Sequence, residues 1–277
     1  MRRGEAGRSR LTFTMCNPPF YASADSLAAS AALKQLPPAA ACTGTATEMV
    51  YEPGGELGFA TRMLHESLVL HARAQWYSTL FGKLSSVSAF TAQLRTAFAA
   101  AGVGGERDGN WTVTEMAQGP TKRWAVAWSF CDRRPAATAS SRSVPALKGC
   151  FPPVNPVLAF GVPRPQAAVE DELVRLLATL DLSTSKRGPG AFYGEVRGNV
   201  WSRAARRALA RGAIMDTGGE GGEGGAVKLG FLFTLGPQLD EPDGAATAAR
   251  VSISWKRGFD GVLFESFCGM VRRKLLL

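Results

Sequence analysis

The chain has 277 residues, 45% of them hydrophobic, and a formal net charge of +9 at pH 7. This hydrophobic fraction excludes a wholly disordered chain, and the length allows one large domain or two of ordinary size. Both parts of the chain are basic, because residues 1–161 hold 16 basic and 10 acidic side chains and residues 162–277 hold 16 and 13. This balance favours a polyanionic partner, and the alternative is a solvated basic surface.

Few residues are available for metal or disulfide chemistry. The five cysteines are far apart with no CxxC pair, and the histidines are His65 and His71 alone. This pattern indicates a reducing compartment and argues against a disulfide framework or a zinc site. No apolar run reaches the roughly 18 residues of a membrane span, and the opening MRRGEAGRSR lacks the apolar centre of a signal peptide. We therefore expect a soluble, intracellular protein without a metal ion.

The first predicted element is a short apolar strand over residues 11–17 (LTFTMCN), and two prolines end it. Proline cannot donate to a β-ladder, so the prolines must follow the carboxyl end of the strand. Residues 22–47 predict a long loop with a short helix near residues 26–35. A helix then runs over residues 54–73 with one buried stripe at helical spacing. The stripe consists of Ala60, Met63, Leu64, Leu68 and His71.

The next elements predict the rest of one sheet. Residues 75–82 (QWYSTLFG) read as a buried strand, and a helix follows over about residues 89–101. Two further strands, residues 111–116 and 123–130, are joined by a short loop, which predicts an antiparallel hairpin. Parallel strands with helical crossovers therefore come first, and an antiparallel hairpin closes the edge of the sheet.

A proline-punctuated stretch over residues 151–165 predicts a domain boundary near residue 162. We expect a small α+β domain over residues 162–277, interrupted by a glycine-rich linker at residues 216–226. Its predicted elements are helices over 172–180, 199–212 and 259–277 and strands over 227–235 and 251–255.

The tetrapeptide Asn17-Pro18-Pro19-Phe20 carries the chemistry. In an open α/β sheet, ligands bind outside the carboxyl ends of the strands. The side-chain oxygen of Asn17 and the backbone carbonyl of Pro18 can each accept one N–H of an exocyclic amine, which aims the nitrogen lone pair at a methyl donor. Two prolines hold these acceptors rigidly, and Phe20 offers a face on which an extruded base stacks. The alternative is that the prolines only end a strand.

Four blocks follow one another between residues 11 and 131: TMCNPPFY, GELGFATRMLHESL, QWYSTLFGKLSSV and EMAQGPTKRWAVAWSF. Together they resemble the methyltransferase-like family of RNA adenine-N6 methyltransferases, which includes the enzymes for eukaryotic U6 spliceosomal RNA and bacterial 23S ribosomal RNA. The resemblance is weaker from residue 162 onward, where the ending FESFCGMVRRKL is similar to the close of the family's accessory region.

The resemblance implies an α/β fold, in which residues 1–161 form the C-terminal half of a Rossmann-like class I methyltransferase sheet and residues 162–277 form an accessory domain. It implies S-adenosylmethionine as methyl donor, with Asn17 to Phe20 as catalytic residues around the target adenine and Asn17 near the methionine end of the cofactor. Lys83 and Arg123 stand where the family uses basic side chains near RNA, and the alternative for each is a solvated charge. The implied partner is structured RNA of the U6 or ribosomal type, and the implied compartment is the nucleus.

Two features depart from the family's pattern. The family's glycine-rich cofactor loop precedes the motif, yet only sixteen residues precede Asn17 here. We therefore expect that the first strands are absent, that the strand over residues 11–17 has an open apolar edge, and that this chain binds S-adenosylmethionine weakly or not at all. Pro120 stands where the family usually has arginine, so a side chain that donates hydrogen bonds to phosphate is missing there.

Two other interpretations remain open. In the first, the chain is a non-catalytic RNA-binding module or a methyltransferase remnant. Its footprint is the helix over residues 200–211, where Arg203, Arg207 and Arg211 recur every fourth residue and share one face, and the alternative is a solvated helix face. In the second, the chemistry is kept but the substrate is DNA adenine or a glutamine side chain.

Overall fold

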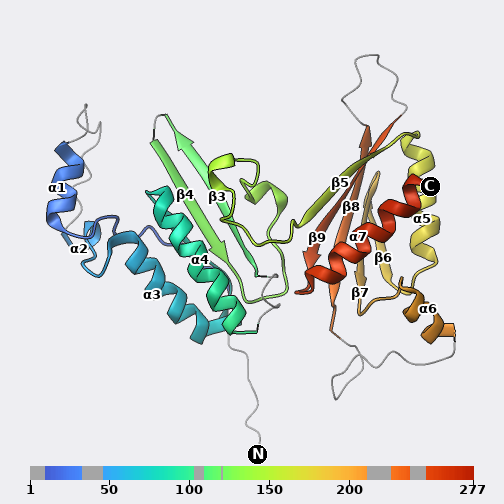
Figure 1. The fold of residues 1–277 in the computed structure, drawn as a ribbon, viewed down its shortest axis with the longest axis horizontal. Coiled ribbons are helices and arrows are strands. Elements are labelled where there is room, and N and C mark those ends of the chain that lie inside the picture. Colours follow the sequence, from blue (N-terminus) through green and yellow to red (C-terminus); the bar gives the residue numbers. More distant parts are fainter. Residues whose placement is uncertain (1–9, 33–45, 103–108, 120, 211–225, 238–247) are drawn as a thin grey trace, which may run out of the picture. The chain divides into compact units, whose positions relative to one another are not determined.

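The chain forms two compact units in the computed structural model (Figure 1). Unit 1 comprises Met1–Cys131 and Thr138–Pro153, and unit 2 comprises Asp132–Ala137 and Val154–Leu277. The structure describes residues 10–32, 46–102, 109–119, 121–210, 226–237 and 248–277. Among these residues, none of the helices combines the length and the apolar character that crossing a membrane requires.

Unit 1 is built on a mixed sheet with the strand order β1-β2-β4-β3. β1 (Leu11–Phe13) runs parallel to β2 (Ala74–Phe81), and β2 pairs antiparallel with β4 (Thr121–Trp128). β3 (Trp111–Gln118) completes the hairpin with β4. The predicted sequence of a parallel pair followed by an antiparallel hairpin is therefore present, and the α/β fold class is confirmed.

Two long helices, α3 (Gly55–Leu70) and α4 (Leu84–Ala100), cover one face of this sheet (Figure 1). Both helices meet Trp128 of β4, which is fully buried. Its ring packs against Phe90 of α4 with 5.3 Å between the centroids, and its indole N–H donates to the Ser67 hydroxyl of α3 at 2.9 Å. The one polar group of this large side chain is thus satisfied inside the core. Further helical segments are α1 (Ala24–Ala32), α2 (Ala46–Met49) and 3₁₀ turns at His71–Arg73, Ala137–Ala139 and Pro145–Leu147.

β1 is an edge strand with apolar side chains on its surface. Leu11 is 60% exposed, Phe13 is 63% exposed, and Met15 just beyond the strand is 80% exposed. Among the described residues, β1 pairs with β2 alone. An unpaired edge of this kind is a template for pairing with another chain. Among the described residues, the outer edge of β1 is thus open and carries apolar side chains.

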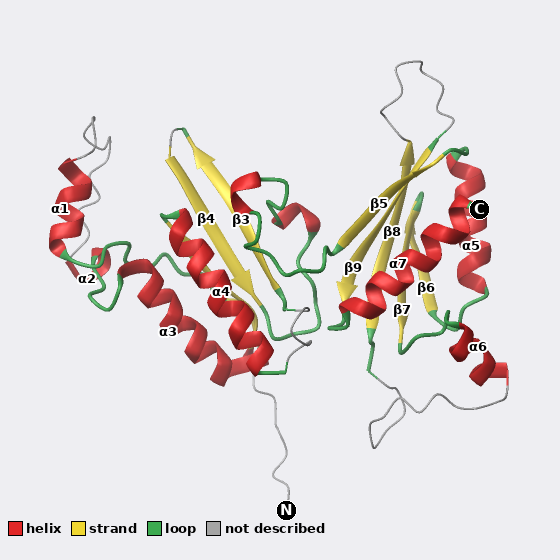
Figure 2. Cartoon of the chain, in the orientation of Figure 1, coloured by secondary structure: helices red, strands yellow, loops and turns green. Residues whose placement is uncertain are grey.

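Unit 2 is an antiparallel sheet with the strand order β5-β9-β8-β7-β6. α5 (Gln166–Ala178) and α7 (Gly261–Leu276) pack on one face of it (Figure 2). The centre of the core is the contact between Phe231 of the sheet and Phe267 of α7, whose ring centroids are 4.4 Å apart. The strands are β5 (Val157–Val162), β6 (Ser183–Gly188), β7 (Ala191–Val196), β8 (Leu229–Pro237) and β9 (Ala249–Arg257).

The short segment Asp132–Ala137 belongs to unit 2, although unit 1 flanks it in the sequence. The guanidinium carbon of Arg134 lies 3.6 Å from the ring centroid of Trp255, and the Arg134 side chain is nearly buried. The carboxylate of Asp132 pairs with the guanidinium of Arg257 at 2.6 Å. The attraction between a cation and an aromatic face is stronger where water is excluded. The contact of Arg134 with Trp255 therefore anchors the segment to β9.

Three strands of unit 2 were not predicted from the sequence, namely β5, β6 and β7. β5 pairs with β9 from end to end, which draws it into the second unit. The units therefore divide at Pro153 and Val154, before the boundary expected at residues 161 and 162. β6 is exposed from Ser183 to Arg187, so its polar sequence lacks the alternation by which a half-buried strand is recognised.

α6 (Arg203–Ala210) begins three residues after residue 200, where the predicted basic helix starts, because Ser202 caps it. The Ser202 hydroxyl accepts the N–H of Ala205 at 3.0 Å, whereas the Asn199 side chain accepts the N–H of Ser202 at 2.9 Å in the turn before the helix. The predicted end of this helix, most of the glycine-rich linker and Pro120 lie outside the described residues.

Replacing Phe13 with lysine should weaken self-association of the chain, because the change removes the largest apolar side chain from the open edge and adds a charge there. Sedimentation velocity over a concentration series would show a lower weight-average mass. Val262 of α7 is 62% exposed, so Val262→Lys is a control of matched exposure and charge. An equal effect of both variants would show that net charge, and not the β1 edge, controls association.

Candidate functional site

The four-residue motif leaves β1 beside the carboxyl end of β2. The backbone N–H of Cys16 donates to the Ser78 carbonyl at 3.1 Å, and the N–H of Leu80 donates to the Cys16 carbonyl at 3.1 Å. Because β1 and β2 are parallel, their carboxyl ends meet at the same edge of the sheet. The residues after Cys16 therefore stand at the edge where open α/β sheets bind ligands.

The members of the motif differ in burial. Asn17 is exposed, and its side chain makes no hydrogen bond within the described part of the chain. Pro18 is buried, and Pro19 and Phe20 are half-buried. The prolines are therefore fixed in the protein, while the amide of Asn17 keeps its hydrogen-bonding capacity for a ligand.

The ring of Phe20 lies between two other parts of unit 1. On β4, the guanidinium carbon of Arg123 is 5.4 Å from the ring centroid. At the end of β2, Gly82 approaches so closely that a Cβ placed there would lie 3.2 Å from Cδ1 of Phe20. The structure thus brings the predicted residues Phe20 and Arg123 together, with an aromatic face and a cation side by side.

Glu56 is a residue of this site that the sequence analysis missed. It lies in the first turn of α3 and is only 3% exposed. Its Oε2 accepts the N–H of Gly82 at 2.6 Å, and its Oε1 accepts the N–H of Lys83 at 3.1 Å. An acidic residue at a helix start is favourable for that helix alone, so the sequence carried no signal that Glu56 reaches a second element.

The backbone beyond Phe20 is held by the segment that leads into α3. The N–H of Tyr21 donates to the Met49 carbonyl at 3.1 Å, and the N–H of Tyr51 donates to the Tyr21 carbonyl at 2.9 Å. Gly55 then passes so near that a Cβ on it would lie 3.1 Å from the backbone of Tyr21, and its φ of +62° is a conformation that favours glycine. These contacts fix the exit of the motif as the β1–β2 pairing fixes its entry.

The predicted basic residues fall into two groups. Lys83 and Arg123 are exposed and belong to unit 1. The backbone N–H of Lys83 donates to Glu56, and the guanidinium of Arg123 lies over the ring of Phe20. Arg203 and Arg207 are exposed on α6 of unit 2. Arg211 lies outside the described residues.

The nearest thiol is unsuited to nucleophilic chemistry. Burial raises the pKa of the Cys16 thiol above its ordinary value, and a weaker hydrogen bond with the Thr79 side chain lowers it in part. A thiol with a raised pKa stays protonated near neutral pH, and the thiolate is the nucleophilic form. Among the described residues, no three His, Cys, Asp or Glu side chains cluster in a way that could hold a metal ion.

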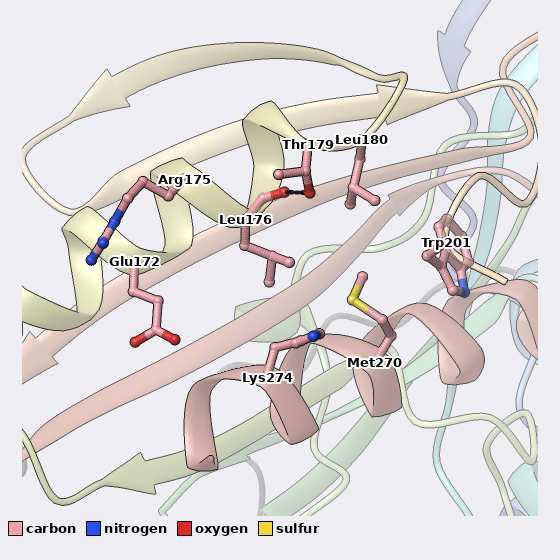
Figure 3. A pocket seen from close by; sticks show the side chains of 8 residues that line it. All are labelled: Glu172, Arg175, Leu176, Thr179, Leu180, Trp201, Met270 and Lys274. Atoms are coloured by element: carbon pink, nitrogen blue, oxygen red, sulfur yellow. Dashed lines mark hydrogen bonds between the residues drawn. The ribbon is translucent and has the colours of Figure 1, made fainter. Parts of the chain in front are cut away.

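Unit 2 contains an open cavity of about 660 Å³ between α5 and α7 (Figure 3). Its apolar part includes Leu176 and Met270, with Lys274 beside Met270, and Glu172 and Arg175 lie together at one end. None of the residues predicted for the functional site lines it.

The mixed sheet of unit 1, with an Asn-Pro-Pro-Phe turn at the carboxyl end of its parallel pair, defines the class of protein as a Rossmann-like methyltransferase fold. The sequence of residues 5–132 matches the family described as RNA methyltransferase. The match covers a little less than half of the 277 residues, and over that part the chain is similar to this family.

Three known proteins show the extent of the similarity. The chain is 32% identical over 271 residues to the U6 small nuclear RNA (adenine-(43)-N(6))-methyltransferase of Schizosaccharomyces pombe, which covers 97% of this chain and 61% of the relative. It is 41% identical over 125 residues to the RNA N(6)-adenosine-methyltransferase mettl16 of Danio rerio, covering 44% of this chain and 24% of the relative. The crystal structure of the hMettl16 catalytic domain in complex with MAT2A 3'UTR hairpin 1 is 38% identical, covers 48% of this chain and 45% of that chain, and has a TM-score of 0.36. The chain thus spans less than two thirds of the length of each.

Replacing Gly82 with alanine should lower the free energy of unfolding by about 1–3 kcal/mol, because the new Cβ would lie 3.2 Å from Phe20 and 3.3 Å from the Glu56 carboxylate. Urea denaturation followed by tryptophan fluorescence measures the change. Gly188→Ala is the control, since a Cβ at Gly188 has no atom within 4 Å. Equal stabilities of the Gly82→Ala variant and the unmodified protein would contradict the close packing of Gly82 on Phe20.

Proposed function

We propose that this chain serves the S-adenosylmethionine-dependent methylation of adenine N6 in RNA. The observation that carries the proposal is the turn at the carboxyl end of β1, where an exposed Asn17, a buried Pro18 and a half-buried Phe20 follow one another. The family match of residues 5–132 supports RNA as the substrate class. The similar proteins of S. pombe and D. rerio are named as methyltransferases of adenine in RNA.

The motif acts on the amine through hydrogen bonds. The lone pair of an exocyclic amine is delocalised into the ring, so the nitrogen is a poor nucleophile in the free base. The amide oxygen of Asn17 and the backbone carbonyl of Pro18 each accept one N–H, which draws the nitrogen towards tetrahedral geometry and directs its lone pair outward. The rigid prolines hold both acceptors in place, so little entropy is lost at the reaction. No strong general base is needed, because the proton leaves a cationic product.

The base itself is held by stacking. Phe20 supplies an aromatic face, and stacking of one base on such a side chain is worth about 1–3 kcal/mol. Arg123, 5.4 Å from this ring, and Lys83, which follows Gly82, are exposed cations at the same edge and serve as contacts for the RNA backbone. Their charge makes binding depend on salt.

S-adenosylmethionine, when bound, supplies an electrophilic methyl group on its sulfonium. The residue of this chain that we assign to it is Asn17, whose exposed amide has donor and acceptor groups suited to the methionine end of the cofactor. The fit rests on that unpaired amide at the ligand-binding edge of the sheet.

We further propose that the partner is a structured RNA of the U6 or ribosomal type, and that the chain acts in the nucleus. Both statements are supported by the S. pombe relative, which is named as a methyltransferase of U6 small nuclear RNA. The net charge of +9 supports a polyanionic partner.

At S-adenosylmethionine concentrations high enough to offset the weak binding expected of this chain, replacing Asn17 with alanine should reduce methyl transfer at least about 100-fold, because one of two acceptors for the reacting amine is lost. The assay follows labelled methyl groups from S-adenosylmethionine into RNA hairpins, duplex DNA and protein in parallel. RNA affinity should stay nearly unchanged. Asn17→Asp keeps an acceptor oxygen and should retain part of the activity. Transfer that prefers DNA or protein, or that survives in Asn17→Ala, would refute the proposed function.

A second function, non-catalytic RNA binding by unit 2, is supported by the exposed arginines Arg203 and Arg207 on one face of α6. Replacing both with glutamine should then lower RNA affinity, and the slope of log K against log salt should become shallower by about one to two. Filter binding at several salt concentrations measures both. Arg175 and Arg272 are also exposed in unit 2, so their double replacement is the matched control. An equal loss in the two double variants would assign the effect to net charge and not to α6.

A further inference from the structure

The carboxylate of Glu56 is buried, and its two oxygens accept hydrogen bonds from the segment between β2 and α4. It is 3% exposed, and it accepts the N–H of Gly82 at 2.6 Å and the N–H of Lys83 at 3.1 Å. A buried carboxylate loses its hydration, so it is stable only where hydrogen bonds replace the lost water. Here the replacement comes from two consecutive backbone groups at the start of α4.

These two N–H groups stand where α4 begins, since Lys83 is its N-cap residue and offers no side-chain cap. The first N–H groups of a helix lack partners within the helix, and the helix dipole favours a negative charge at that end. By accepting the N–H of the N-cap residue Lys83, Glu56 does for α4 what the glutamate of a capping box does, although it belongs to α3. The contact joins the beginnings of two helices on the same edge of the sheet.

The same contact reaches the motif through Gly82. A Cβ on Gly82 would lie 3.2 Å from Cδ1 and 3.5 Å from Cε1 of Phe20, so the backbone of Gly82 is a wall against one side of the ring. The position of this wall depends on the hydrogen bond from Gly82 to Glu56. Arg123, the other neighbour of the ring, is an exposed side chain and restrains the ring less than the backbone of Gly82 does.

We propose that Glu56 is a positioning residue of the candidate site. Through Gly82 it sets the plane of the Phe20 ring on which adenine stacks, and through the N–H of Lys83 it sets the point from which the Lys83 side chain extends towards RNA. The role in base stacking rests on the proposed function, whereas the ordering of Phe20 does not.

A carboxylate is needed for this task because both partners are donors. Glutamine has nearly the same shape but replaces one acceptor oxygen with an NH₂ group, which cannot accept the second N–H. Glu56→Gln therefore keeps the volume of the side chain and leaves one backbone donor without a partner. This variant separates the hydrogen bonds of Glu56 from its packing.

The first measurement uses the full chain without RNA. With ¹³C-labelled phenylalanine and ¹⁵N-labelled glycine, Glu56→Gln should shift and broaden the ring signals of Phe20 and the amide signal of Gly82. Ser67→Ala is the control, because Ser67 bonds to Trp128 in the core of unit 1 away from the motif. Unchanged Phe20 signals in Glu56→Gln, or the same change in Ser67→Ala, would overturn the positioning role.

The second measurement compares six-residue oligoadenylate and oligouridylate RNA. Glu56→Gln should lower the affinity for oligoadenylate at least about fivefold, which is the lower end of the effect of losing one stacked base. It should lower the affinity for oligouridylate less, because the smaller ring of uracil stacks more weakly. Equal losses for both oligomers, or no loss, would overturn the role in base stacking. The proposed function fails on its own measurement, methyl transfer to RNA hairpins, whereas the ring signals of Phe20 decide whether Glu56 orders the motif.

Discussion

The candidate site depends on the parallel hydrogen bonds between β1 and β2. The N–H of Thr14 donates to the Trp76 carbonyl at 2.8 Å, and the ladder continues through Cys16 to the N–H of Leu80. These bonds carry the chain to the carboxyl edge of the sheet, where the prolines end it. Proline cannot continue the ladder, and Asn17, just before the two prolines, is exposed to solvent at this edge.

The site is completed by contacts that cross from one element to the next. α3 begins against the backbone that follows the motif, and its Glu56 holds the turn between β2 and α4. β4 lies on the other side of β2 and brings Arg123 to the ring of Phe20. Each of these residues is far from the motif in the sequence, and the fold of unit 1 brings them to one edge of its sheet.

Unit 2 has a hydrophobic core and a sheet of its own, and long-range strand pairing holds that sheet together. Its core joins α5 and α7 to one face of an antiparallel sheet, and the segment Asp132–Ala137 joins it through Arg134 and Trp255. The sequence predicted β8 and β9, because both alternate between buried and exposed residues. It did not predict β6, since an exposed edge strand has no apolar alternation to recognise.

The sequence by itself determined the strand, the prolines and the motif, because strand termination and the hydrogen-bonding groups of Asn17 are local properties. It also predicted the first long helix of unit 1 from its hydrophobic periodicity and the hairpin from the short loop between its strands, whereas the second helix begins five residues earlier than expected. Only the tertiary structure decided that Glu56 serves the turn at Gly82, that Arg123 meets Phe20, and that β5 belongs to unit 2. These are contacts between residues distant in the chain, and no local pattern specifies which elements the sheet brings together.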